Sequence, residues 1–513
     1  MALFESLLIL LAVAIALSQV SRHLNIPYPT MLAVAGLLIA AVPGLPDIGF
    51  DPHLALALFI APALLDAAFD LPPRTLMRHW MPLLALVGGA VMLTTAAVAW
   101  VGVSGWGMAW PSAIALGAIV APPDAAAASA VLARFNLPRN TLAVLKGESL
   151  LNDAVSLLIF TVAVGAASPG VQISSLALQV SIAVPGGLVF GFIAGRILVV
   201  ISPKLAGTVS GTVAQFVATF AVWVIADQFH VSAILAVVAY GMTVAHYAPE
   251  RTAARDRMHA YSVWEAVVFL LNVLAFLLMG LQARTILLRL HGPDLGRALE
   301  FAGVVVAIVV LVRFAWVMIY NRLRAFVGRW SGRDEAPTAR QGLVVAWCGM
   351  RGLVTLAAAV SLPPTFPQRD LIVLGAFAVV IGTLVGQGLT LGPLISLLKF
   401  KPDGSFDAEL SKARMALLDF GLATFKDRTD PSAVKLRDIY SAERSISNKG
   451  QHPREVTQLD RLRRETIAAM RQRLADMRRN AEMDDDIFHA LEQELDVSEM
   501  AALPPADLEM LES

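Results

Sequence analysis

The chain has 513 residues, of which 57% are hydrophobic and only 16% are charged. Its mean hydropathy of +0.66 lies far outside the range of soluble globular proteins, so the composition predicts a membrane protein. The formal net charge of zero argues against a nucleic-acid partner, and the single Cys348 excludes both a disulfide framework and a multi-cysteine metal site.

Apolar runs recur along the first 400 residues, and about 13 of them are near the roughly 20 residues that a bilayer requires. The first run, residues 1–20, lacks a basic n-region and an Ala-x-Ala cleavage site, which predicts a first membrane helix rather than a removed signal. With the N-terminus outside, the inward loops hold roughly 16 Lys and Arg and the outward loops about 4. This asymmetry predicts a cytoplasmic C-terminus in a multi-pass protein of the inner or plasma membrane.

The fifth segment contains Pro122 and Pro123, followed by Asp124. Proline lacks an N–H and clashes with the carbonyl one turn back, so this pair predicts a broken helix at mid-membrane. The break frees the carbonyls near Ala118 and Ile119 for a cation. Asp124 would begin the second half-helix, where the positive end of the dipole favours a carboxylate. A proline kink with a capping aspartate is the simpler alternative.

The sixth segment carries two carboxylates and an amide near its start. Helical spacing sorts its polar residues into two pairs one turn apart, Glu148 with Asn152 and Ser149 with Asp153. Charges at this depth cost at least a few kcal/mol each and are usually kept for function. The pattern predicts that a neighbouring helix holds one pair while the other meets a cation.

The twelfth segment contains Arg351 between Gly349 and Gly352, which predicts a second interrupted helix. Paired interruptions in two halves of a chain are typical of transporter sites, so segments 4–6 and 11–13 are predicted to be inverted repeats whose broken helices cross. A buried arginine needs a carboxylate, and we predict a pair of Arg351 with Glu148, bridged by Asn152. That pairing leaves Asp153 to titrate.

The composition changes from about residue 400. Residues 401–513 are rich in Arg, Asp and Glu and contain no spanning run, which predicts a cytosolic helical domain beside a transmembrane domain of residues 1–400. Residues 455–497 show helical periodicity with an apolar stripe among arginines. The simplest interpretation is an appendage that packs on itself or on a second copy.

Five stretches of the chain resemble the monovalent cation:proton antiporter-1 family, the bacterial and eukaryotic Na+/H+ exchangers. The similarity covers about residues 1–400 and is most specific where Glu-Ser-x-x-Asn-Asp is joined to the Arg-Gly break. The stretches are Ala61–Phe69, Ala121–Ala125, Gly147–Ala154, Trp264–Gly280 and Gly349–Gly352.

The resemblance implies an all-α homodimer of about 13 transmembrane helices, with a dimerisation domain and a core of about six helices that moves against it. It also implies roles for individual residues. Asp153 would be essential, Asn152 would mark electroneutral members, Ser149 would help to ligate the ion, and Glu148 would form a structural ion pair with Arg351. Acidic ligands of the third and fifth helices would fall at Asp66 and Asp124.

Two features depart from the family pattern. Many members have Thr-Asp-Pro at the fifth-helix break, whereas this chain has Pro122-Pro123-Asp124, which removes a threonine ligand and shifts the aspartate by one residue. Asp66 replaces the glutamate that is common in prokaryotic relatives. Both differences bear on which ion is bound.

The leading hypothesis is antiport of one Na+, or K+ or Li+, for one proton at Asp153. Burial disfavours a charged carboxylate while a cation favours it, so the two ions compete for one position. A cation channel or uniporter is the alternative, although no repeated filter motif appears. Enzyme motifs such as His-Glu-x-x-His and Gly-x-Ser-x-Gly are absent from the sequence, so we expect neither an enzyme nor a cofactor.

Overall fold

The structure is a computed structural model, and it describes most of the chain as helices. The described residues are 2–24, 28–40, 52–69, 80–124, 128, 132, 139–167, 173–289, 293–331, 338–400, 405–424, 426–448, 458–480 and 485–502. No strand occurs among them. The chain divides into two compact units, Met1–Lys401 together with Ser513, and Pro402–Glu512.

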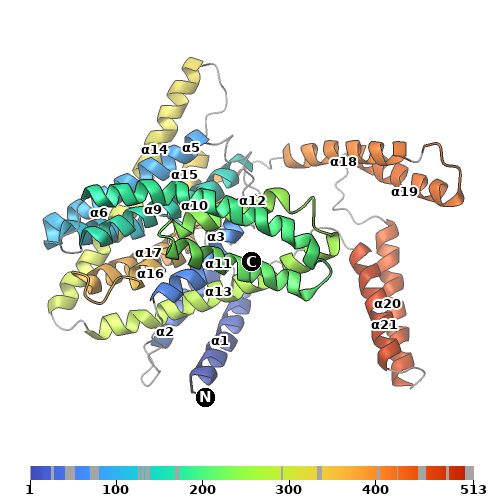
Figure 1. Cartoon of the computed structure of the whole chain (residues 1–513), viewed down its shortest axis with the longest axis horizontal. Coiled ribbons are helices and arrows are strands. Elements are labelled where there is room, and N and C mark those ends of the chain that lie inside the picture. The colour runs from blue at the N-terminus through green and yellow to red at the C-terminus, as the bar shows by residue number, and fades with distance from the viewer. Residues whose placement is uncertain are drawn as a thin grey trace. The chain divides into compact units, whose positions relative to one another are not determined.

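The first unit contains the apolar helices (Figure 1). Seven stretches in the described part are long and apolar enough to cross a membrane: Ala85–Trp106, Val144–Ala166, Ala177–Leu205, Val209–Gln228, Ala254–Ala275, Gly296–Phe326 and Arg369–Leu398. In chain order the helices are α1 (Ala2–Leu24), α2 (Tyr28–Ala40), α3 (Pro52–Phe69), α5 (Trp80–Leu84), the π-helix η1 (Ala85–Ala90), α6 (Val91–Trp106), α7 (Trp110–Val120), α9 (Arg139–Ala166), α10 (Ile173–Ile201), the short 3-10 helix η2 (Ser202–Leu205), α11 (Val209–Gln228), α12 (Ala233–Tyr247), α13 (Ala254–Arg289), α14 (Pro293–Ser331), α15 (Ala339–Trp347), α16 (Leu353–Val360) and α17 (Arg369–Leu398).

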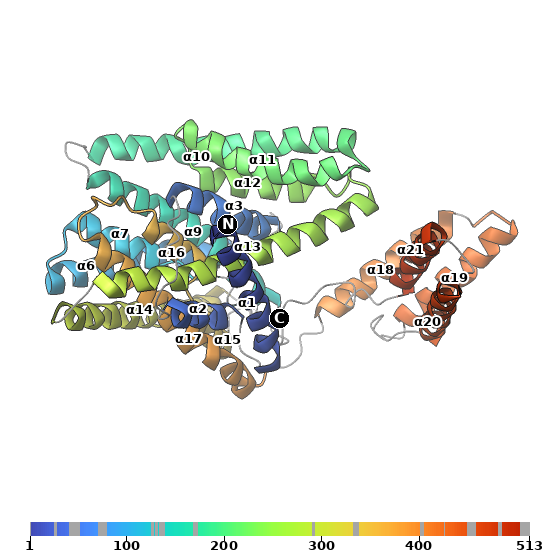
Figure 2. The same ribbon diagram turned by 90° about the horizontal axis from the view of Figure 1, so that it is seen from below.

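Helices α10, α11 and α12 lie side by side, and α3 packs against α12 beneath them (Figure 2). Glycine makes the closest of these approaches possible, because a Cβ atom at Gly191 of α10 would overlap the carbonyl oxygen of Ala236 in α12. Small residues of this kind let helix backbones pack tightly where no hydrophobic effect drives them together.

The centre of the first unit is built from α7, α9, α16 and α17, which pack against one another with a buried apolar core. Helices α9 and α17 are continuous, whereas two other segments are interrupted. Helix α7 ends at Val120, and residues 121–124 are not helical. A second gap, residues 348–352, separates α15 from α16. Both interruptions therefore lie where the prolines and glycines predict them, although most of the second half-helix after Asp124 lies outside the described residues.

The second unit consists of two helical hairpins. Helix α18 (Ser405–Thr424) packs against α19 (Pro431–Asn448), and α20 (Gln458–Arg479) packs against α21 (Asp485–Ala502). The periodicity of residues 455–497 corresponds to α20 and α21, whose shared core is Ile467, Leu474 and Leu495. Arg471 joins the two helices, and its hydrogen bonds to Asp496 and Glu499 raise the pKa of this guanidinium.

Candidate functional site

Helix α9 carries the two predicted polar pairs, and the structure separates them by burial. Glu148 and Asn152 are 0% exposed, whereas Ser149 and Asp153 are 7% and 8% exposed. The two members of each pair are one turn apart, so the pairs occupy two adjoining strips of the same helix. The stretch Val144–Ala166 of α9 is apolar and long enough to cross a membrane. Neighbouring helices hold the few polar residues of this stretch in place.

Arg313 of α14 is the partner of Glu148. Its Nη1 lies 2.6 Å from Glu148 Oε1 and its Nη2 lies 3.1 Å from Glu148 Oε2. The two residues thus form a bidentate ion pair, and both side chains are buried. Asn152 Nδ2 donates to the same Oε1 at 3.2 Å. The predicted pairing of Glu148 with Arg351 is therefore corrected, because Arg313 engages both carboxylate oxygens, while the predicted contact of Asn152 with Glu148 is present.

Arg351 instead binds the end of a broken helix. Its Nε donates to Val120 O at 3.0 Å and its Nη2 to Ala121 O at 3.3 Å, the last carbonyls of α7. A third guanidinium bond goes to Gly349 O. The C-terminus of a helix carries partial negative charge on its unpaired carbonyls, so these contacts stabilise the fully buried guanidinium of Arg351.

Asp124 performs the reciprocal role. Its Oδ2 accepts from Leu353 N, the first residue of α16, at 3.3 Å, and its own N–H donates to Met350 O at 2.6 Å. A carboxylate at a helix N-terminus matches the positive end of the dipole. The predicted cap of Asp124 on its own second half-helix falls on residues outside the described ones, while the described hydrogen bond caps the other broken helix. Gly352 permits this contact, because a Cβ atom there would overlap Asp124 Oδ2.

The carbonyls freed by the first break are largely occupied by protein donors. Ser156 Oγ of α9 donates to Ala118 O at 2.7 Å, and this oxygen also accepts from Ala121 N. Ala118 is therefore a poorer cation ligand than its sequence position suggests. In contrast, Asn152 Oδ1 is a fully buried acceptor with no hydrogen-bond partner among the described residues. Buried acceptors are nearly always satisfied, so this oxygen is suited to a water molecule or a cation.

A small cavity of about 20 Å³ lies between the first helix break and the start of α9. A cavity needs about 10–15 Å³ to hold one water, so it has room for one water or one bare monovalent cation. Asp124 lines this cavity and Asp153 does not. The charge of Asp153 nevertheless interacts with that of Asp124. The cavity is lined by Pro123, Asp124, Ala128, Leu132, Leu142, Leu145, Lys146, Glu148, Ser149 and Cys348.

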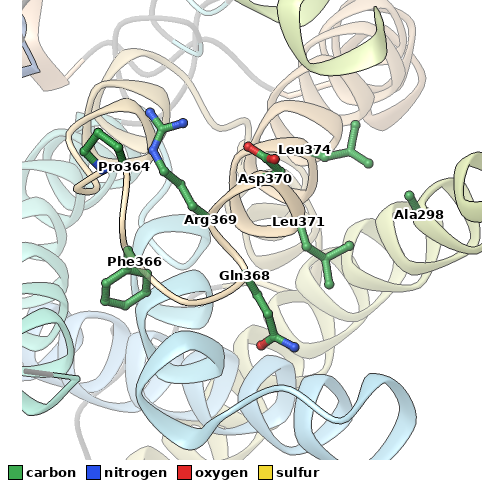
Figure 3. Close-up of a pocket in the computed structure, with 8 residues that line it drawn as sticks. All are labelled: Ala298, Pro364, Phe366, Gln368, Arg369, Asp370, Leu371 and Leu374. Carbon is green, nitrogen blue, oxygen red and sulfur yellow. The ribbon is translucent and has the colours of Figure 1, made fainter. Parts of the chain in front are cut away.

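A larger cavity of about 480 Å³ lies where α16 leads into α17 (Figure 3). Its polar side chains are Gln368, Arg369 and Asp370, and Ala298 of α14 closes one side. The eight residues of α16 separate this cavity from Asp124, which is roughly 12 Å along a helix axis. It shares no lining residue with the small cavity and is not part of the polar site.

The structure places three of the predicted site residues around one cavity. Asp124, Ser149 and Glu148 line one cavity, with Asp153 and Asn152 one turn along α9. Asp66 of α3 does not line that cavity, and its side chain is exposed.

Three contacts were missed from the sequence. Two are the Ser156 bond to Ala118 and the identity of Glu148 as the partner of Arg313, whose deep position in an apolar run predicts a structural ion pair. The third is Thr383 Oγ1, which accepts from Arg351 N at 3.0 Å. A charge in the middle of an apolar run was the only available signal, and it marks Arg313 but not Ser156 or Thr383.

A buried ion pair and two broken helices that cap each other inside an apolar helical bundle define the class of membrane ion transporters. The chain belongs to the sodium/hydrogen exchanger family, whose transmembrane model matches residues 7–397. This confirms the family predicted from the sequence, which is one of transporters rather than enzymes.

Named relatives agree with this assignment. The chain is 28% identical to an uncharacterized Na+/H+ exchanger of Mycobacterium tuberculosis, over 98% of this chain and 97% of that protein. It is 28% identical to the sodium, potassium, lithium and rubidium/H+ antiporter of Bacillus pumilus, over 98% of this chain and 78% of that protein. Its fold is similar to that of the sodium proton antiporter MjNhaP1 of Methanocaldococcus jannaschii, with a TM-score of 0.63 at 18% identity, covering 78% of this chain and 100% of the other.

Proposed function

We propose that this protein exchanges one monovalent cation for one proton across the inner or plasma membrane by alternating access. Na+ is the first choice of cation, with K+ or Li+ as alternatives. The observation that carries the proposal is the contrast on α9, where Glu148 is neutralised by Arg313 while Asp153, on the adjoining strip of the helix, is 8% exposed. Burial favours the protonated carboxyl and a cation favours the carboxylate, so one group serves both ions in turn.

The proposed ligands surround Asp153 on two sides. Ser149 supplies a hydroxyl from the same strip of α9, and Asp124 interacts with Asp153 electrostatically. Asn152 Oδ1 adds a buried acceptor without a hydrogen-bond partner in the described part of the chain. Asp66 joins this set only if its exposed side chain turns inward during transport. Because Asn152 carries no titratable charge, a single carboxyl exchanges its proton for one monovalent ion, which supports electroneutral 1:1 exchange.

The choice of cation rests on hard oxygen ligands, which suit alkali cations. The relative from Bacillus pumilus is named for exchange of four alkali cations with H+, which supports a site that is not restricted to Na+. The cavity of about 20 Å³ is large enough for a bare ion of this class.

We further propose the architecture that such exchange needs. It consists of about 13 transmembrane helices with inverted repeats, divided within residues 1–400 into a dimerisation domain and a moving core of about six helices. Residues 401–513 form the cytosolic domain of a homodimer, and the N-terminus lies outside. The excess of basic residues in the inward loops supports this orientation.

The mutual caps support a core that moves as a body. Arg351 ties α7 to the second break, and Asp124 ties the first break to α16. Because each broken helix depends on a side chain from the other, the two are expected to move together around Asp153. Alternating access by rigid rocking of one bundle against another requires such a unit.

The test is proton flux in proteoliposomes reconstituted with the full chain and driven by gradients of Na+, K+ or Li+. Asp153→Asn is expected to abolish exchange, because the amide cannot release a proton. Asp227→Asn, an exposed acid near the end of α11, is the control and should keep the native rate. Exchange at a near-native rate in Asp153→Asn would remove the central residue from the mechanism.

The same preparation tests the stoichiometry and the mode of transport. An imposed membrane potential should leave the rate unchanged if exchange is 1:1, and a potential that drives exchange would contradict that ratio. Cation flux without opposite movement of protons would indicate a channel or uniporter instead.

A further inference from the structure

Lys146 is a positively charged residue of α9 close to the proposed site. It lies within the apolar stretch Val144–Ala166, three residues before Ser149 and seven before Asp153. Residues at these spacings share one face of a helix. At 1.5 Å per residue, its Cα lies about 10 Å along the helix from that of Asp153.

Exposure differs between the two ends of this face. Lys146 is exposed, whereas Ser149 and Asp153 are only 7% and 8% exposed. The other strip of α9, which carries Glu148 and Asn152, is fully closed. A cation that approaches Asp153 from the Lys146 end of α9 therefore passes the ammonium group first.

Lys146 shares the small cavity with acidic residues. Lys146, Asp124 and Ser149 all line it. Glu148 lines it too, but both of its oxygens are bound to Arg313, so its charge is already balanced. The acids whose field the ammonium changes most are thus Asp124 and, through it, Asp153.

We propose that Lys146 determines the cation affinity of the site and its preference for monovalent over divalent ions, an inference that rests on the proposed exchange at Asp153. A fixed positive charge at the approach lowers the local concentration of cations and weakens their binding. Coulomb repulsion scales with the charge of the ion, so it opposes Mg2+ or Ca2+ twice as strongly as Na+ in free energy. Lys146 is a specificity-determining residue in this scheme and does not itself exchange a proton.

The variant Lys146→Gln tests the proposal in full-length protein in proteoliposomes. The half-saturating Na+ concentration should fall about three- to tenfold with little change in maximal rate, as expected for one charge about 10 Å away in a partly screened site. Inhibition of Na+ exchange by Mg2+ should strengthen by about the square of that factor, roughly ten- to hundredfold. A structural role for the side chain would not produce this relation between the two ions.

Two matched variants serve as controls. Lys146→Arg keeps the charge and should stay within about twofold of the native values. Lys204→Gln removes an exposed lysine in η2 and should leave both ions unaffected. If Lys146→Gln does not fold, Lys146→Met provides the same loss of charge with an apolar chain of similar length.

The outcomes separate this inference from the proposed function. If Asp153→Asn abolishes exchange while Lys146→Gln and Lys146→Met leave Na+ and Mg2+ values at the native level, only the role of Lys146 is overturned. A rise in the half-saturating Na+ concentration would overturn it as well, because it would make the lysine a support of the site. Persistent exchange in Asp153→Asn would overturn the proposed function instead.

Discussion

The two polar pairs of α9 differ although they lie on adjoining strips of one helix, offset by a single residue. The acid of the first pair, Glu148, is fully buried and bound through both oxygens to Arg313. The acid of the second pair, Asp153, is slightly exposed and lies near a second acid, Asp124. Depth in the membrane is therefore not what distinguishes a structural acid from a transport acid. The packing of neighbouring segments decides, because Arg313 of α14 binds Glu148 through both oxygens, whereas Asp153 meets the charge of a second acid, Asp124.

The largest expected effect comes from breaking the first pair. Arg313→Met leaves the charge of Glu148 buried without its partner, which typically costs about 3–5 kcal/mol of stability. The thermal unfolding midpoint of detergent-solubilised protein should drop strongly, while Arg322→Met, an exposed position on the same helix, should leave it unchanged. Equal midpoints for both variants would mean that the pair does not stabilise α9.

The mutual cap of the broken helices provides the second prediction. Gly352→Ala forces a Cβ atom onto Asp124 Oδ2, and overpacking in a tight site costs roughly 1–3 kcal/mol. Both the unfolding midpoint and the rate of proton exchange should fall. Gly303→Ala in α14 meets no atom within 4 Å and provides the matched control. Native exchange in Gly352→Ala would argue against a rigid link between the two breaks.

A smaller effect on stability is expected at the contact between α9 and the end of α7. Ser156→Ala removes the hydrogen bond to Ala118 O and should cost about 1 kcal/mol, the usual net value of a buried bond. The half-saturating Na+ concentration should change little if Ala118 is not a ligand. Ser181→Ala, which removes a local bond to Leu178 O on the exposed side of α10, is the comparison for stability. A large change in cation affinity would return Ala118 to the ligand set.

The smallest effect belongs to the second unit. Arg471→Ala removes contacts to Asp496 and Glu499, but these side chains are 34%, 53% and 40% exposed. Exposed ion pairs contribute about 0.2–1 kcal/mol because water and salt screen them. The half-saturating Na+ concentration for exchange by the full chain should stay at its native value. A clear shift would show that the α20–α21 hairpin influences the transport site.

Much of the molecule follows from local patterns. Apolar runs predict the spanning helices, and the unbroken run after Glu148 predicts α9. The proline pair and the glycines around Arg351 predict the two interruptions, since missing N–H groups and unrestrained backbone act within one turn. The pairing of residues four apart on α9 follows from helical geometry alone.

The contacts between helices could not be obtained in the same way. Arg351 and Arg313 both lie in apolar segments as buried arginines, and nothing in their local sequence indicates which one reaches Glu148. The choice depends on which helix packs against which face of α9. The same holds for the Asp124 cap on α16, which crosses more than two hundred residues of chain.

The sequence alone determined the family, the position of the helix breaks and the one strip of α9 that carries a candidate transport acid, because periodicity and backbone chemistry are local properties. Only the tertiary structure decided that Arg313 neutralises Glu148, that Arg351 and Asp124 cap each other's broken helices, and that Lys146 shares a cavity with Asp124. These are electrostatic relations between segments distant in the chain, and they exist only once packing has set the distances on which Coulomb energies depend.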